Sequence, residues 1–114
     1  MYFVDIMGVE IRRQNSGSWK FTPILRHSVG TTKTIEVVYY FQGSNIPVQK
    51  IFSIAPKNPK EIYAEENAAI LKEGYMALEG QVRLEVYMDK KLNSRIDFSF
   101  TSYLVKNGVV EIHR

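Results

Sequence analysis

The stretch KTIEVVYYFQ at residues 33–42 decides the fold class of this chain. Every second side chain from Ile35 to Phe41 is apolar, and β-branched and aromatic residues predominate. Alternation with a period of two is typical of a β-strand that buries one face. The pattern predicts a strand whose odd-numbered residues fill the core and whose Tyr40 points outward.

Further strand patterns lie on both sides of this one. Gly8 predicts a bulge in the first strand, and Pro23 predicts an edge position or a bulge in the second. Asn107-Gly108 is a type I′ hairpin signal, so we expect the last strand to fold back on the one before it. The other strands are expected at 4–13, 19–26, 47–55, 82–88, 96–104 and 109–113, with a loop at 89–95. Expected core residues are Val4, Ile6, Ile35, Val37, Leu71, Leu84, Val86, Phe98 and Phe100.

The period changes after residue 57. Asn58 has the chemistry of a helix N-cap, Pro59 suits the first helical position, and Glu61 completes a capping-box pair. Gly74 stands where a left-handed C-cap is expected. These signals predict a helix near 59–73, with Tyr63, Asn67, Ile70 and Leu71 on one face.

Length and composition indicate one globular domain spanning 1–114. The chain is 45% apolar and 24% charged, which is ordinary for a folded protein. It has no cysteine, and no apolar run approaches the roughly 18 residues that span a bilayer. We therefore expect a cytoplasmic protein with no membrane partner.

The order of elements is mostly β with a minor helical part. It matches a five-to-six-stranded antiparallel OB-like barrel that places one helix between strands three and four. Other β-architectures accommodate the same order. OB-folds bind oligonucleotides over strands two and three and through the loops 1–2 and 4–5.

One part of the sequence resembles a known family. The run 64–74 is similar to the helix of bacterial single-stranded-DNA-binding proteins, which ends in a Leu-Lys-Lys-Gly-like motif, and residues 76–82 resemble the strand that follows it. Residues 4–9 look like that family's first strand, and 46–48 resemble a tripeptide that precedes its helix. A primosomal replication protein shares the fold. The resemblance implies an OB-fold and single-stranded DNA binding.

Aromatic and basic residues supply candidates for such a surface. Single-strand binders stack bases on aromatic rings and follow the backbone with Lys and Arg. Lysines in hairpin loops also protect edges, and strand tyrosines also cover pleated surface, so each residue has a purely structural alternative. The candidate nucleic-acid-binding residues are Arg12, Arg13, Trp19, Lys20, Tyr40, Tyr87, Lys90, Lys91, Arg95 and Tyr103, with the loop lysines and the first two arginines bracketing Trp19 and Tyr40.

The sequence carries no catalytic or metal-binding pattern. His27 and His113 stand alone, and no nucleophile motif or phosphate-binding loop occurs. We expect neither an enzyme nor a cofactor. Two hypotheses remain: a module for single-stranded nucleic acid, and a protein-interaction or assembly module of a phage or mobile-element type. Exposed strand edges would allow pairing with a protein partner or a homo-oligomer.

Overall fold

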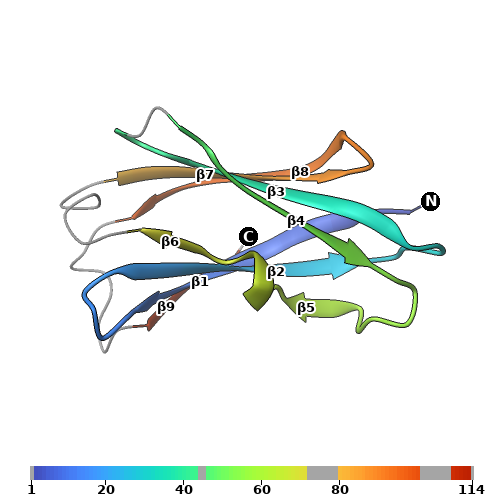
Figure 1. The fold of residues 1–114 in the computed structure, drawn as a ribbon, viewed down its shortest axis with the longest axis horizontal. Helices are drawn as coiled ribbons and strands as arrows, with labels where there is room; N and C mark the ends of the chain where they lie inside the picture. Colours follow the sequence, from blue (N-terminus) through green and yellow to red (C-terminus); the bar gives the residue numbers. More distant parts are fainter. Residues whose placement is uncertain (1, 44–45, 72–79, 101–108, 114) are drawn as a thin grey trace.

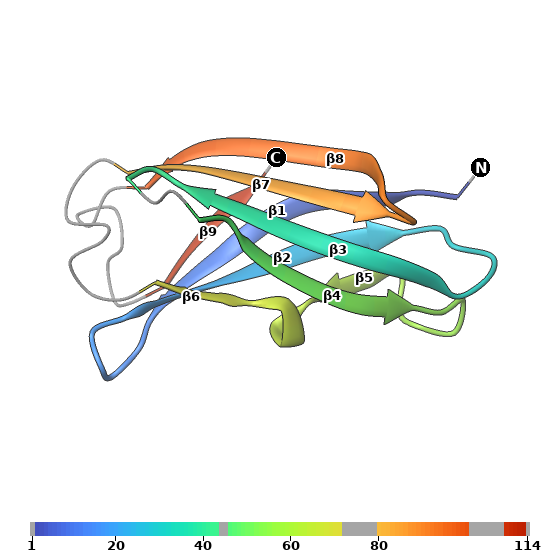
Figure 2. The ribbon, with the colours of Figure 1, turned by 45° about the horizontal axis from the view of Figure 1, so that its top comes forward.

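The chain folds into two antiparallel sheets that face each other (Figures 1 and 2). The computed structural model describes residues 2–43, 46–71, 80–100 and 109–113. Nine strands and one short 3₁₀ turn lie in this part of the chain. Their bounds are β1 Val4–Arg13, β2 Trp19–His27, β3 Lys33–Phe41, β4 Val48–Ile54, β5 Glu61–Tyr63, η1 Glu65–Asn67, β6 Ala69–Leu71, β7 Gly80–Met88, β8 Lys91–Phe100 and β9 Val109–His113.

The first sheet has the strand order β5-β2-β1-β9. Strand β6 also pairs with β2, at Trp19–Phe21, whereas β5 pairs with it at Ile24–Arg26. The expected bulge at Gly8 is confirmed, because the register between β1 and β2 shifts between Ile6 and Gly8. A Cβ at Gly8 would lie 2.2 Å from the Ile112 carbonyl oxygen, so β9 approaches too closely for any side chain there. Strand β9 pairs with β1. The expected hairpin at Asn107-Gly108, which would fold β9 back on the residues just before it, lies outside the described residues.

The second sheet has the order β4-β3-β7-β8. The expected strands at 33–42, 47–55 and 82–88 are confirmed, but residues 91–95 belong to β8 and not to a loop. The connection between β7 and β8 is only two residues long. Asp89 and Lys90 have φ of 49° and 70°, which is the left-handed backbone of a tight hairpin turn.

The core lies between the two sheets. Large fully buried side chains include Tyr39, Phe21, Ile6 and Leu84, drawn from both sheets. The core prediction is confirmed for Val4, Ile6, Ile35, Val37, Leu71, Leu84 and Val86. Phe98 is partly buried against the same cluster, and the side chain of Phe100 lies outside the described residues.

The helix expected near 59–73 is wrong. As far as residue 71 is described, this segment is β5, η1 and β6, running along the outer edge of β2. Asn58 caps a turn instead of a helix, since its side-chain oxygen accepts the Ala55 N–H at 2.7 Å. His27 Nε2 donates to the Pro59 carbonyl at 2.9 Å and so fixes the entry into β5. Gly74 lies outside the described residues.

Pro23 explains why β2 holds two short partners. In an antiparallel sheet, the N–H and the C=O of one residue both point to the same neighbouring strand. Proline has no N–H, so it cannot complete such a pair. Its carbonyl still accepts the Ala64 N–H at 2.9 Å. The ladder with β5 ends at Ile24 and the one with β6 begins at Phe21, so η1 turns at the interruption.

The described part of the chain shows two antiparallel sheets, and their closure into the expected barrel is not shown. Side chains of β8 bridge one edge: Ser94 Oγ accepts the Ile6 N–H at 3.1 Å and donates to Asp5 Oδ1 at 2.8 Å. At the opposite edge β4 lies beside β5 and η1, and residues of all three elements line a pocket. Figure 2 shows the arrangement of these elements. The architecture is a β-sandwich with one edge bridged and one edge open.

Candidate binding face

The outer face of the second sheet gathers tyrosine, arginine and exposed apolar side chains. Cross-strand register places these residues in three rows across the strands. We call this surface the tyrosine face. It comprises Ile51, Glu36, Tyr87 and Leu92 in the first row, Val38, Glu85 and Arg95 in the second, and Tyr40, Arg83 and Asp97 in the third.

Tyr40 and Arg83 are directly opposite each other on β3 and β7. The Arg83 guanidinium carbon lies 4.9 Å from the centroid of the Tyr40 ring, a cation–π contact. Arg83 also lies 4.0 Å from carboxylate oxygens of both Glu85 and Asp97. Arg95 contacts the other Asp97 oxygen at 3.1 Å. The charged side chains of the face therefore hold one another in place through these contacts.

Tyr87 is held by Glu85. The Tyr87 hydroxyl donates to a Glu85 carboxylate oxygen at 2.9 Å. This hydrogen bond and then partial burial raise the pKa of Tyr87 above its ordinary value. Partial burial and then the same carboxylate raise the pKa of Tyr40. Both phenols stay protonated at neutral pH and remain donors.

Apolar side chains border this polar cluster. Ile51 on β4 is 67% exposed and Leu92 on β8 is 52% exposed, at the two sides of the sheet. Val38, in the second row, is 3% exposed. The face thus combines polar and aromatic side chains with exposed apolar side chains on its two outer strands.

Of the predicted site residues, the structure brings Tyr40, Tyr87 and Arg95 together on this face. Lys90 lies in the β7–β8 turn, and Lys91 begins β8 at the same end of the sandwich, at the right of Figure 1. Tyr40 and Tyr87 point outward as expected. Tyr103 lies outside the described residues.

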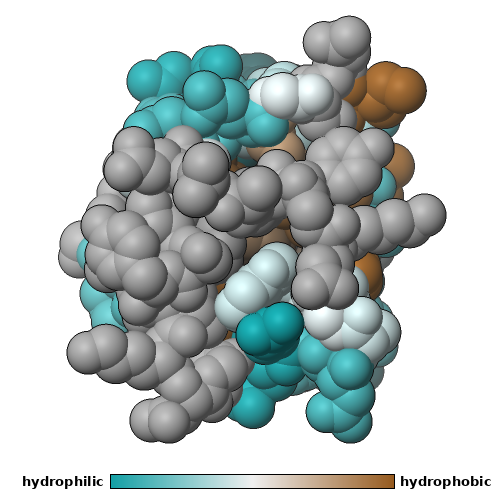
Figure 3. Space-filling model, turned by 90° about the vertical axis from the view of Figure 1, so that its left-hand side faces the viewer, coloured by the Kyte–Doolittle hydropathy of each residue, from teal (hydrophilic) through white to brown (hydrophobic). Residues whose placement is uncertain are grey.

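The other predicted residues lie on the first sheet, at the end of the 41 Å long axis opposite the β7–β8 turn (Figure 1). Strand β3 also ends there, so Tyr40 lies toward the same end but on the other sheet. Trp19 is 7% exposed and belongs to the core cluster, with the Arg13 guanidinium 5.6 Å from its ring centroid. Figure 3 views this end, where described hydrophilic side chains gather in separate groups at the top and the bottom. The two predicted groups therefore do not bracket a common surface.

Arg12 and Lys20 are both engaged with carboxylates. Arg12 Nε lies 3.5 Å from Glu10, and Lys20 Nζ lies 2.7 Å from Glu65. The bond from Lys20 lowers the pKa of Glu65. A phosphate would have to displace these partners.

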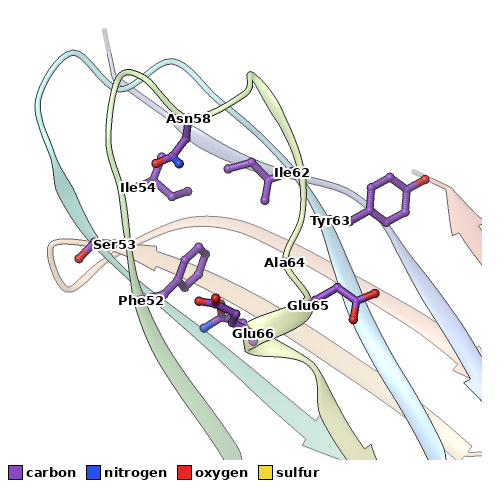
Figure 4. Close-up of a pocket in the computed structure, with 10 residues that line it drawn as sticks. Phe52, Ser53, Ile54, Asn58, Ile62, Tyr63, Ala64, Glu65 and Glu66 are labelled. Atoms are coloured by element: carbon purple, nitrogen blue, oxygen red, sulfur yellow. The ribbon is translucent and has the colours of Figure 1, made fainter. Parts of the chain in front are cut away.

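A second feature lies at the open edge of the sandwich. A slot of about 310 Å³ separates β4 from β5 and η1 (Figure 4). Phe52, Ile54 and Ile62 point into it, and Glu66 lies beside Phe52, whereas Tyr63 points away. Its lining also includes Ala64 and both Asn58 and Asn67.

Asn67 has an unsatisfied amide oxygen. Its side chain is buried, with the residue 2% exposed, and no described residue donates to Oδ1. Its backbone carbonyl, by contrast, accepts the Tyr39 hydroxyl. A buried acceptor without a donor costs about 1–3 kcal/mol, so the free protein carries a cost at this position.

Sequence reasoning missed Arg83, Glu85 and Asn67. The alternation Arg83-Glu85-Tyr87 on an expected strand was the available signal for the first two, since it places all three on one face. The helical pattern places Asn67 on one face with Tyr63, Ile70 and Leu71. In the structure Asn67 is buried because it ends the turn η1, which packs against β2.

Comparison with known proteins adds no identity: no family model matches the chain, and no curated protein matches its sequence. Within the described ranges, no group of three metal-ligating side chains occurs and no helix is long and apolar enough to cross a membrane.

Proposed function

We propose that this chain is a non-catalytic protein-interaction module that binds its partner through the tyrosine face. The observation that carries the proposal is the composition of one surface. Two tyrosines and two arginines lie on it, and Ile51 and Leu92 are exposed on its two outer strands. Tyr and Arg are enriched where protein interfaces concentrate their binding energy.

The charge of the face favours a protein over a nucleic acid. Glu36, Glu85 and Asp97 carry three negative charges, and Arg83 and Arg95 carry two positive charges, which gives a net charge of −1. Binding to single strands rests on unopposed cations that displace counterions. A balanced set of ordered ion pairs gives specificity toward a protein surface instead.

The size of the face fits a modest interface. Four strands at about 4.8 Å spacing and five to six residues at about 3.3 Å rise span roughly 300–400 Å². A standard interface buries about 800 Å² on each partner. The tyrosine face alone therefore matches a transient contact, or the centre of a larger one.

Photo-cross-linking tests the proposal. A benzophenone amino acid replaces Tyr40 on the tyrosine face, or Tyr63 on the outer face of the first sheet as the control. Tyr63 is an exposed strand tyrosine of the same chemistry. In the native cell we expect one discrete protein adduct from position 40 and none from position 63.

The adduct must also depend on the face. Tyr87→Ala should remove it, because the variant loses a central aromatic contact and frees Glu85. Equal adducts from both positions, or an adduct that survives Tyr87→Ala, would contradict the proposal. A nucleic-acid adduct from position 40 would favour the other hypothesis.

A further inference from the structure

We infer that His27 is a pH-sensitive latch, whose imidazole holds residues 58–63 against the edge of β2 when neutral and releases them when it takes up a second ring proton. His27 is the last residue of β2 and is 1% exposed. Every hydrogen bond described for its ring goes to a backbone atom. The latch shares no residue with the tyrosine face, so it does not depend on the proposed function.

The backbone partners of His27 fix one neutral tautomer. Nε2 lies 2.9 Å from the Pro59 carbonyl oxygen and 3.3 Å from the Asn58 carbonyl oxygen. A carbonyl oxygen only accepts, so Nε2 carries the ring hydrogen. The Val29 N–H donates to Nδ1 at 3.3 Å, so Nδ1 keeps its lone pair.

This geometry has no place for a second ring proton. A hydrogen on Nδ1 would face the Val29 N–H, donor against donor. The site is buried, so water cannot replace the lost hydrogen bond or solvate the charge of the imidazolium. The second proton therefore binds only when the ring leaves its site, and the ring then gives up its bond to Pro59.

The surrounding charges do not stabilise an imidazolium in this site. Asp5 on β1 and Glu61 on β5 are register partners of Arg26, whose side chain points to the opposite face of the sheet from His27. On the second sheet, at the same end of the sandwich, the Asp89 carboxylate is bonded to Lys33 and to the Thr34 N–H. The other charged residues in the segment that His27 holds and in the β7–β8 turn are cations, namely Lys57, Lys60 and Lys90.

The segment after residue 57 has few other contacts with β2. Strand β5 pairs with β2 over three residue pairs, whereas β1 pairs with β2 over nine. Of the three β5 side chains, only that of Ile62 packs against the core. Parts of a fold with few buried contacts open locally while the rest stays folded. We therefore expect release of the segment without unfolding of the two sheets.

The sign and size of the pH effect follow from linkage. A free imidazole takes up its second proton near pH 6.5. The released segment binds that proton and the closed segment does not, so the closed form is favoured above about pH 6.5 and loses ground as the pH falls. Between pH 7.5 and pH 5 the equilibrium constant for opening should rise about thirtyfold.

Amide hydrogen exchange measured by NMR at pH 7.5, 6 and 5 tests this inference, with rates expressed as protection factors. The His27 N–H is the reporter, because it donates to the Lys60 carbonyl at 3.0 Å and exchanges when the segment leaves β2. Its protection should fall about thirtyfold across this range. Amides of the ladder between β3 and β7 should keep their protection, since those strands remain paired.

Two variants assign the effect to one ring. His27→Gln retains an N–H donor for the Pro59 carbonyl but has no titrating group, so the segment should open to the same extent at pH 7.5 and pH 5. It should be more open than wild type at pH 7.5, because the Val29 N–H loses its acceptor. His113→Gln changes the other histidine, which is exposed on β9, and should keep the full response. The ¹⁵N shifts of the wild-type imidazoles give a measurement without any variant and should show the Nε2–H tautomer of His27 at pH 7.5.

Several results would overturn the inference. Unchanged protection of the His27 amide at pH 5, or a thirtyfold response that survives in His27→Gln, would show that this ring is not the latch. Imidazolium signals from His27 in a segment that stays protected would show that the buried site accepts the second proton. An equal loss of protection in the ladder between β3 and β7 would show global unfolding instead of local release.

Discussion

The tightest backbone in the described chain is the two-residue turn between β7 and β8. Both Asp89 and Lys90 have positive φ, a region that costs an ordinary residue about 1–2 kcal/mol. Asp89 has compensation: its N–H donates to the Thr34 carbonyl at 3.0 Å, and its carboxylate accepts the Thr34 N–H and contacts Lys33 at 3.1 Å. No described contact compensates Lys90 in this way.

We therefore predict that Lys90→Gly stabilises the protein by about 0.5–1 kcal/mol, because relief of the strained backbone exceeds the extra entropy of unfolded glycine. Lys91→Gly is the control. Lys91 lies in β8, where glycine should destabilise by about 0.5–1 kcal/mol. Urea unfolding measures both, and a destabilising Lys90→Gly would show that the turn is not strained.

Asp89 also makes stability depend on pH. Its contacts with Lys33 and with the Thr34 N–H lower its pKa below the ordinary value of 3.8. A lowered pKa in the folded state gives stability above the ordinary value, and this stability is lost as pH falls through the folded pKa. Wild type should therefore exceed Asp89→Asn in Tm at pH 7, and the gap should close below pH 3.8. A gap that persists at pH 2, or one insensitive to salt, would contradict the assignment.

At the scale of elements, the segment 61–71 is where sequence and structure differ most. As a helix it would bury both Ile70 and Leu71 on one face. As strand β6 it exposes Ile70 by 53% and buries Leu71. Neighbouring residues of a strand point to opposite faces, so substitutions at the two positions should have very different costs.

We predict that Ile70→Thr changes the free energy of unfolding by less than about 0.5 kcal/mol. Leu71→Ala should cost about 2–4 kcal/mol, because it leaves a cavity in the core. Thermal or urea unfolding checks both. Comparable losses at the two positions would restore the helical interpretation.

Sequence alone could predict the strands, because alternation repeats over seven or more residues. It could also predict the bulge at Gly8, whose cause is local. It could not predict β5 and β6. The signals at Asn58 and Pro59 are real turn chemistry, but short helices are weak in water, and the open edge of β2 offers partners that no local pattern reveals.

The candidate site divides in the same way. Strand parity correctly placed Tyr40 and Tyr87 on an outer surface. Trp19 is buried in the core cluster, to which both sheets contribute, and the pairing of the sheets could not be read from the local pattern. The sequence identifies the basic residues but does not predict their ion-pair partners. Lys20, for example, pairs with Glu65, which is 45 residues away in the sequence.

At the scale of the whole molecule, the cations predicted to bind nucleic acid do not form one unpaired group. The chain carries a formal net charge of +3. Yet Arg12, Lys20 and Arg95 are each paired with a carboxylate, and Lys90 lies at the other end of the sandwich from Arg12. Exposed pairs of this kind contribute little to stability, but they reduce the attraction for a polyanion.

The claim that this sandwich recognises protein rather than single-stranded nucleic acid is tested most directly by titrating a fluorescent thymidine oligonucleotide with the purified chain at low and rising salt. We predict no binding in the micromolar range at low salt, and no difference between wild type and the variant with Lys90 and Lys91 both changed to Ala. Micromolar binding whose logarithm falls with log salt at a slope of about −2 to −3.5, flattened by about one in that variant, would contradict the account and support a phosphate-binding surface.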